Sequence, residues 1–297
     1  MNEEFAIEPT ALKDYKDVRF VLGKFGFHEG RFISALPSKW VNEVYAQLEK
    51  LPDGPSKLSA KELVRKTARI HGGIVSSGVS FDPSKSWLSN ASTCGKDFEG
   101  ILVSSETASS GRDVECNSID EIDDSFFGSC REVMLRATVD EFGKVATKLL
   151  DFSSEVFLID PYFNFSNPLY MDVLKEFVRI GAKGKCKKFV IYTAAMVNKF
   201  DAVEKILRQN FLGSGASIKV YHVEQDVSEY EYHARFLLSQ FGGIRSDKGF
   251  KPEDVLRVVT TIDLGMHSKL CKLYLDGEHG FKIIKEHNFP RINTYAD

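Results

Sequence analysis

A histidine and an arginine occupy alternate positions at the head of the apolar segment YHARFLLSQFGG, residues 232–243. Alternate side chains of a β-strand project from the same face, so an extended segment would present His233 and Arg235 side by side. An imidazole can act as a nucleophile or a general acid, and a guanidinium stabilises negative charge on phosphate oxygens. The pair therefore predicts binding of a phosphodiester, or attack on it. The alternative is that His233 is a structural histidine at the start of a strand.

A carboxylate that could orient the imidazole stands at the end of another apolar segment, EVFLID. Asp160 closes this segment just before a proline, and polar groups that bind ligands gather at the carboxyl ends of strands in α/β sheets. We therefore expect Asp160, His233 and Arg235 to line one cleft. The competing interpretation is that Asp160 only begins a turn.

A second group of candidates follows the paired glycines Gly242 and Gly243. A glycine turn lets backbone N–H groups approach an anion, so Arg245 and Lys248 beyond it are expected to bind phosphate. Neither this pair nor the glycines at residues 72–73 match a P-loop or dinucleotide fingerprint, so no nucleotide cofactor is expected.

The elements that must position these residues lie from residue 146 onward. Strand-like segments alternate there with helical ones, which indicates parallel strands joined by right-handed helical crossovers. The expected strands are EVFLIDPYF, KKFVIYT, SIKVYHV and HARFLL, and the expected helices are residues 138–150, 169–180 and 198–211. The fold class is therefore α/β, with a mixed or parallel sheet flanked by helices in residues 146–297.

Residues 1–145 are expected to form a smaller N-terminal α/β region. A strand pair, or a strand and a loop, is predicted in residues 17–36, and helices are predicted over 38–48, behind a capping Ser38, and over 59–70. The Ser-rich, acidic stretch around 104–125 is expected to be a loop or a partly disordered insertion.

Composition narrows the classes of function. The chain has 297 residues, a formal net charge of −3 and five cysteines. An odd number of cysteines without C-x-x-C spacing predicts neither a disulfide framework nor a zinc site, so no metal is expected. The acidic N-terminus and the absence of a long apolar run predict a cytoplasmic protein without a membrane partner.

The segment around the histidine resembles the phospholipase D superfamily, whose motif is H-x-K-x-x-x-x-D. His233 and Arg235 occupy the histidine and lysine positions, and Gln240 stands where the family has aspartate. With IDPYF upstream and FGGIRSDKGF downstream, residues 155–250 look like a bacterial branch in which H-D-R-Y-x-x-T-D precedes a Gly-Gly turn. A second H-x-K at His267 lies in a segment whose apolar periodicity predicts a plain helix.

The resemblance implies a metal-independent phosphodiesterase in which one histidine attacks phosphorus and a second protonates the leaving oxygen. A chain with one motif would take the second histidine from a partner copy, so a homodimer is expected. Because Gln240 is not an anion, Asp160 or Glu224 would have to orient the imidazole.

The expected substrate is nucleic acid, with DNA favoured over RNA. The resemblance also makes a nuclease role in antiphage defence plausible, with partner proteins of such a system. The rival hypothesis is a catalytically degenerate module that holds nucleic acid or a partner protein, and Gln240 is the residue that favours it.

Overall fold

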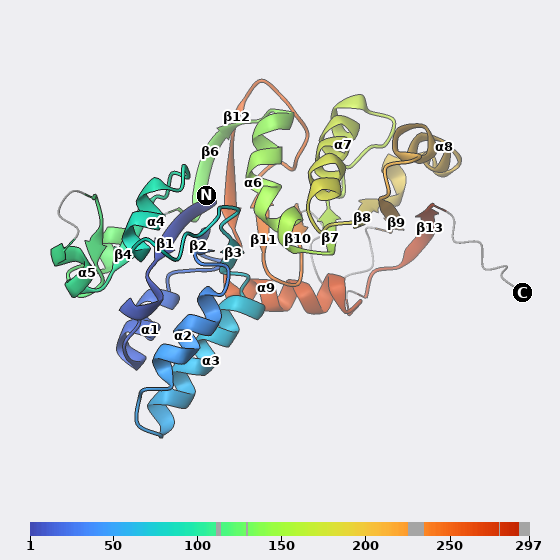
Figure 1. The fold of residues 1–297 in the computed structure, drawn as a ribbon. Helices are drawn as coiled ribbons and strands as arrows, with labels where there is room; N and C mark the ends of the chain where they lie inside the picture. Colours follow the sequence, from blue (N-terminus) through green and yellow to red (C-terminus); the bar gives the residue numbers. More distant parts are fainter. Residues whose placement is uncertain (111–113, 129, 225–234, 279, 291–297) are drawn as a thin grey trace, which may run out of the picture. The chain divides into compact units, whose positions relative to one another are not determined.

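The computed structural model describes the chain except for residues 111–113, 129, 225–234, 279 and 291–297, and its contacts divide the chain into two compact units, Met1–Arg131 and Glu132–Asp297 (Figure 1). The structure moves the predicted boundary from residue 145 to residue 131, because residue 145 lies inside helix α6 (Val139–Phe152). The physical reason is pairing: strand β6 (Glu132–Arg136) joins β12 (Leu256–Thr261), so both it and α6 belong to the second unit.

The first unit is built around a parallel sheet with the strand order β3-β2-β1-β4-β5 among the described residues. Its strands are β1 Glu3–Ile7, β2 Arg31–Ala35, β3 Ile74–Ser76, β4 Gly100–Val103 and β5 Asn117–Ser118. Its helices are α1 Tyr15–Leu22, α2 Trp40–Leu48, α3 Pro55–Arg69, α4 Trp87–Thr93 and α5 Ser105–Ser110, with 3-10 turns η1 Pro9–Ala11 and η2 Asp124–Phe127.

Phenylalanine rings fill much of this unit's core. Phe5 of β1 meets Phe25 edge-on at 5.4 Å between ring centroids, and Phe25 meets Phe127 at 5.9 Å. Edge-to-face pairs at such distances add to the stability that burial alone provides.

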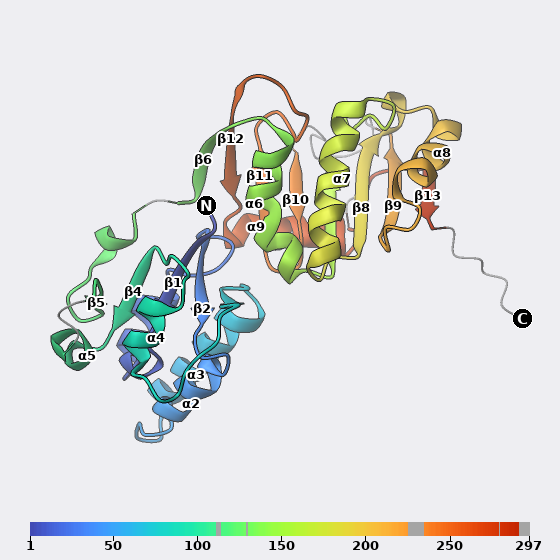
Figure 2. The ribbon, with the colours of Figure 1, turned by 45° about the horizontal axis from the view of Figure 1, so that its top comes forward.

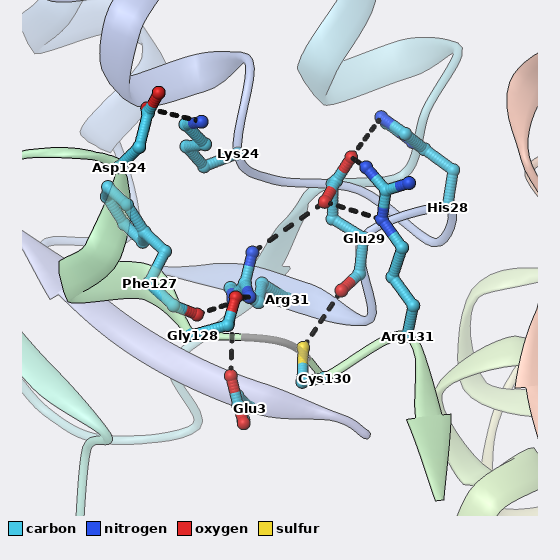
Figure 3. A network of polar contacts seen from close by, with 10 residues as sticks. All are labelled: Glu3, Lys24, His28, Glu29, Arg31, Asp124, Phe127, Gly128, Cys130 and Arg131. Carbon is cyan, nitrogen blue, oxygen red and sulfur yellow. Dashed lines mark hydrogen bonds and ion pairs between the residues drawn. The ribbon is translucent and has the colours of Figure 1, made fainter.

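A buried arginine of β2 connects the C-terminal residues of this unit to its central strands (Figure 3). Arg31, whose side chain is 3% exposed, lies with Nε 3.3 Å from a carboxylate oxygen of Glu3 and Nη1 3.7 Å from one of Glu29. Its Nη2 donates to the carbonyl oxygens of Phe127 and Gly128. A buried guanidinium needs such partners, since burying a charge without them is costly.

Two expectations for the N-terminal region were wrong. Residues 15–22 form helix α1 rather than a strand or a loop, because Asp14 and Asp17 make a capping box at its start, whereas β2 confirms one strand in residues 17–36. The stretch 104–125 is not simply a loop: its described residues include α5 and β5, and β5 extends the sheet beside β4.

The second unit contains a mixed sheet flanked by helices, as predicted, with the order β13-β9-β8-β7-β10-β11-β12-β6 among the described residues (Figure 2). Its remaining strands are β7 Glu155–Ile159, β8 Lys188–Ala194, β9 Ser217–Val223, β10 Phe236–Leu238, β11 Gly243–Ser246 and β13 Ile283–Phe289. Strands β7, β8 and β9 are parallel neighbours, which confirms the prediction for EVFLI and KKFVIY, and the other pairings are antiparallel.

The helices of the second unit are α6, α7 Pro168–Lys183, α8 Phe200–Phe211 and α9 Leu264–Leu270, with 3-10 turn η3 Ala195–Val197 and π-helical turn η4 Cys271–Leu275. One face of the sheet buries Phe157 and Ile159 against Leu270 and Tyr274 of α9 and η4. The alternate residues of β7 face the other way, toward the helices α6 and α7. No helix in the described part of the chain is long and apolar enough to cross a bilayer.

The second H-x-K segment forms α9, as the periodicity predicts. His267 is buried, and its Nε2 lies 2.7 Å from the carbonyl oxygen of Ser239. Since only an N–H can bond to a carbonyl oxygen, Nε2 is the donor. His267 therefore stabilises the hairpin between β10 and β11.

Candidate active site

Asp160 lies directly after β7 and is 1% exposed. Its backbone N–H donates to the carbonyl oxygen of Tyr192 in β8, and its own carbonyl oxygen accepts from the N–H of Phe163. The carboxylate oxygen Oδ1 accepts from the backbone N–H of Tyr162 at 2.9 Å. The turn that the Asp-Pro sequence predicts is therefore present, and it holds the carboxylate at the end of the strand.

Arg235 reaches this carboxylate from the neighbouring strand. Antiparallel pairing of Phe236 with Ile159 continues to place Arg235 opposite Asp160, with Nε 3.9 Å from Oδ1. Nη1 donates to the carbonyl oxygen of Asp247 at 2.9 Å, and the guanidinium carbon lies 4.8 Å from the centroid of the Tyr162 ring. The guanidinium is fixed by three neighbours, yet its side chain is 21% exposed. It can therefore still meet an anion.

A glycine that the sequence analysis missed closes the site. Gly249 follows β11 with φ +80°, and a Cβ there would lie 2.5 Å from Oδ2 of Asp160 and 2.8 Å from Cδ of Arg235. Ser246 holds the loop by donating its hydroxyl to the carbonyl oxygen of Gly249 at 2.6 Å. Only glycine combines this backbone conformation with this close approach. Its signal in the sequence was the turn S-D-K-G-F.

Burial raises the pKa of Asp160 to about 6. The N–H groups of Tyr162 and Phe250 and the positive charges of Arg235 and Arg257 act in the opposite direction. Oδ2 is enclosed and makes no hydrogen bond of standard geometry to a described residue. A carboxyl group with a pKa near neutrality can change charge state under mild conditions, a property common at functional sites.

A second arginine lies behind this site. Arg257 of β12 is 2% exposed, and its Nη2 donates to a carboxylate oxygen of Glu253. Its Nε and Nη1 are buried without a hydrogen-bond partner among the described residues. Two guanidinium groups therefore act on one buried carboxylate, and nothing in the sequence pattern signalled the second.

His233 lies outside the described residues. The structure brings Asp160 and Arg235 together as expected, and the predicted position of His233 beside them stays a prediction.

The second set of expected phosphate ligands is divided between the two faces. Arg245 pairs across the hairpin with Phe236, which packs on the α9 side, so Arg245 projects from the face opposite Arg235. Lys248 is exposed in the loop that contains Gly249, on the site's border.

The paired glycines serve the hairpin. The carbonyl oxygen of Gly242 accepts from the backbone N–H of Ser239 at 2.8 Å, which closes the turn. A Cβ on Gly243 would lie 2.5 Å from Cδ2 of Leu238, so this glycine permits close packing. Its expected contact with an anion stays a prediction.

Glu224, the other carboxylate expected to orient the imidazole, and Gln240, at the family's aspartate position, follow other strands than Asp160 does. Glu224 follows β9 and forms an ion pair with Lys282, whose Nζ lies 2.6 Å from Oε2 but outside the angular range of a hydrogen bond. Gln240 is exposed in the connection between β10 and β11. Among the described residues, no three His, Cys, Asp or Glu side chains converge in a way that could hold a metal ion.

Comparison with known proteins found similarity to solved structures. Among solved structures, the chain is similar to a phospholipase D family member, Nuc from Salmonella typhimurium, with a TM-score of 0.33 and 11% sequence identity over 48% of this chain and 90% of that one. No protein-family model and no curated protein matches the sequence.

Proposed function

We propose that the second unit binds a phosphodiester of nucleic acid at Arg235 and hydrolyses it with His233. The observation that carries the proposal is the guanidinium of Arg235, fixed and partly exposed beside the buried carboxylate of Asp160. Fixed cationic donors next to a reacting phosphate stabilise the charge that develops in the transition state.

The proposed chemistry has two steps. A ring nitrogen of His233 attacks phosphorus, forming a P–N bond as the P–O bond to the leaving oxygen breaks, and that oxygen takes a proton from a general acid. Water then attacks the phosphohistidine and releases the phosphate ester. Asp160, in its ionised form, would orient the imidazole.

The general acid of the first step would come from a partner copy. One motif per chain supplies one histidine, so a homodimer with two facing motifs is the arrangement that completes the site. Light scattering should then give twice the mass of one chain, and mixed dimers of wild-type and His233→Ala chains should lose most of the wild-type rate. A strict monomer that still cleaves DNA would contradict the facing arrangement.

The test of activity uses fluorescent single- and double-stranded DNA, with RNA in parallel. Cleavage should persist in EDTA and disappear in His233→Ala. Arg235→Ala should weaken DNA binding by about ten-fold or more, since a charge-assisted hydrogen bond is lost. Arg245→Ala is the matched control, because this arginine projects from the opposite face of the same hairpin and should leave cleavage unchanged. Cleavage that needs added Mg²⁺ and survives His233→Ala would place the activity elsewhere.

A second candidate function is a binding module without catalysis. The observation that favours it is Gln240, which is neutral and exposed in a hairpin turn, where the resembling family has an aspartate. This alternative predicts DNA binding that Arg235→Ala weakens, with no cleavage by the wild-type chain under any of the above conditions.

We also propose, from the resemblance alone, a role in antiphage defence. Expression of the wild-type chain with its neighbouring genes should reduce phage plating, and His233→Ala should restore it. Equal plating with both chains would refute an enzymatic role in defence.

A further inference from the structure

A groove lies between helix α8 and the edge strand β13, away from Asp160 and Arg235. It has a volume of about 310 Å³ and is lined by the first two turns of α8 and by residues of β13. Five consecutive residues of β13, Lys285–Phe289, line it. Because successive side chains of a strand point to opposite faces, a groove lined by both sets runs along the strand's hydrogen-bonding edge.

That edge is open within the described part of the chain. β13 pairs with β9 on one side and with no other described strand on the other. An open edge presents unpaired N–H and C=O groups in a row, which another extended segment can pair with.

The α8 side of the groove has an apolar part and an acidic part. Phe200 and Leu207 supply apolar surface, and Asp201 and Glu204 supply carboxylates. Neither carboxylate forms an ion pair or a hydrogen bond with another residue that the structure describes. Both act on His287 of β13, so they face the strand across the groove.

His287 lines the groove, and the buried His222 lies beneath it. Nε2 of His287 and both ring nitrogens of His222 are buried without a hydrogen-bond partner among the described residues, and their ring centroids are 5.2 Å apart. His222 is completely buried. An unpaired buried acceptor is costly, and a donor that enters the groove would relieve that cost at His287.

We propose that this groove binds an extended segment of another protein as an added strand beside β13, with lysine or arginine side chains directed at Asp201 and Glu204. Strand addition to a sheet edge draws its affinity from main-chain hydrogen bonds and its specificity from alternate side chains. Both groups lie on α8, so they act on the alternate side chains of the added strand that face this helix: the carboxylates favour basic residues there, and the surface of Phe200 and Leu207 favours aliphatic ones. Lys285, also in the groove, disfavours an uninterrupted run of positive charge.

The test uses the full chain and a fluorescein-labelled heptapeptide, Lys-Thr-Val-Thr-Lys-Thr-Val, in which the lysines and valines share one face of the extended peptide. Fluorescence anisotropy should show saturable binding. The same peptide with alternate backbone nitrogens methylated should bind more than about ten-fold more weakly, because several main-chain hydrogen bonds are lost. A peptide with glutamate in place of lysine should not bind.

Protein variants locate the site. Asp201→Lys combined with Glu204→Lys should weaken binding by about five-fold or more. Asp140→Lys combined with Asp172→Lys, at exposed positions of α6 and α7, is the charge-matched control and should change it little. Amide hydrogen exchange should slow in β13 on peptide binding and stay unchanged in β6, the opposite edge. Equal affinity for the methylated peptide, or exchange protection outside β13, would overturn the proposal. Absence of binding together with protected β13 amides in the free chain would mean that the chain covers its own edge, which also overturns it.

Discussion

Gly249 is the residue on which the geometry of the candidate site depends most directly. Gly249→Ala should displace Asp160 or Arg235, because the new Cβ would lie 2.5 Å from the carboxylate, and it should cost about 1–3 kcal/mol in unfolding free energy. DNA binding should fall with it. Chemical denaturation and anisotropy measure the two effects.

Gly213→Ala separates the effect of backbone strain from the effect of the clash with Asp160 and Arg235. Gly213 has nearly the same φ, +82°, but nothing within 4 Å of the position of a Cβ. It should therefore carry the backbone strain without any loss of DNA binding. Equal loss in both variants would mean that Gly249 contributes only backbone conformation.

Asp160 should make phosphate binding depend on pH. Its pKa is raised to about 6, so lowering the pH through 6 removes a negative charge beside Arg235 and should strengthen DNA binding by about five-fold. Measurements in a His233→Ala background exclude titration of that imidazole. Asp160→Asn in the same background should bind tightly at every pH, and an unchanged pH profile in that variant would contradict the assignment.

The same shift affects stability with a definite sign. Between pH 4 and 6 the folded chain holds the Asp160 proton that the unfolded chain has released, so this group's contribution to stability falls as the pH rises through that window. At neutral pH Asp160 is ionised, which lowers the stability of the folded chain and is the form that would orient the imidazole.

At the scale of elements, the pairing of β9 with β13 should be sensitive to acid. Burial, His287 and Lys285 lower the pKa of His222 to about 4. Below the ordinary histidine pKa of about 6.5 the unfolded chain binds a proton that the folded chain refuses, so the contribution of His222 to stability should fall by about 1–3 kcal/mol as the pH drops from 6.5 to 4. An Asp160→Asn background removes the opposite contribution of Asp160 over the same pH range. Thermal unfolding at several pH values measures this loss.

His222→Leu is the variant that tests it. Leucine keeps an apolar contact with Phe200, whose ring lies 4.8 Å from the imidazole, and removes the titrating group. The loss of stability between pH 6.5 and 4 should shrink. An unaltered dependence would assign the acid sensitivity to other groups.

The strands around the site could be predicted from the sequence because burial determines their composition. β7 and β8 are buried on both faces, so they are nearly continuous runs of β-branched and aromatic residues, and β9 shows the alternation of a strand with one buried face. Helix α1 was missed because Phe20, Val21 and Leu22 suit a strand as well as a helix, and the capping signal in Asp14 and Asp17 precedes them.

Only some residues of the candidate site could be predicted from the sequence. The alternate spacing of His233 and Arg235 and the strand-end position of Asp160 are local signals. Gly249 comes close to the same carboxylate, and the charge of Arg257 lowers its pKa, through the pairing of β10, β11 and β12, which local periodicity does not encode. The face from which Arg245 projects is hidden from the sequence for the same reason, since the hairpin register decides it.

At the scale of the whole molecule, the two units should respond separately to a change in one core. Arg31→Leu removes a buried guanidinium and leaves Glu3 and Glu29 without it, which should destabilise the first unit by about 3–5 kcal/mol. Calorimetry should show one transition lowered, while DNA binding by the second unit persists.

An exposed ion pair in the same unit provides the control. Arg65→Leu breaks a contact between Arg65 and Glu62 at the surface of α3 and should change the unfolding temperature little. A single transition that moves as a whole in Arg31→Leu would show that the units unfold together.

The strand order of the second unit also determines how it would respond to tension. Among the described residues, β6, the first strand of the unit, lies at one edge of its sheet, and β13, its last strand, lies at the other. A pulling force applied to these ends would act across the sheet and peel its strands from both edges, breaking the hydrogen bonds of a strand pair one after another rather than all at once. Such an unzipping geometry yields at low force, so translocating machinery that grips either end would unravel this unit readily.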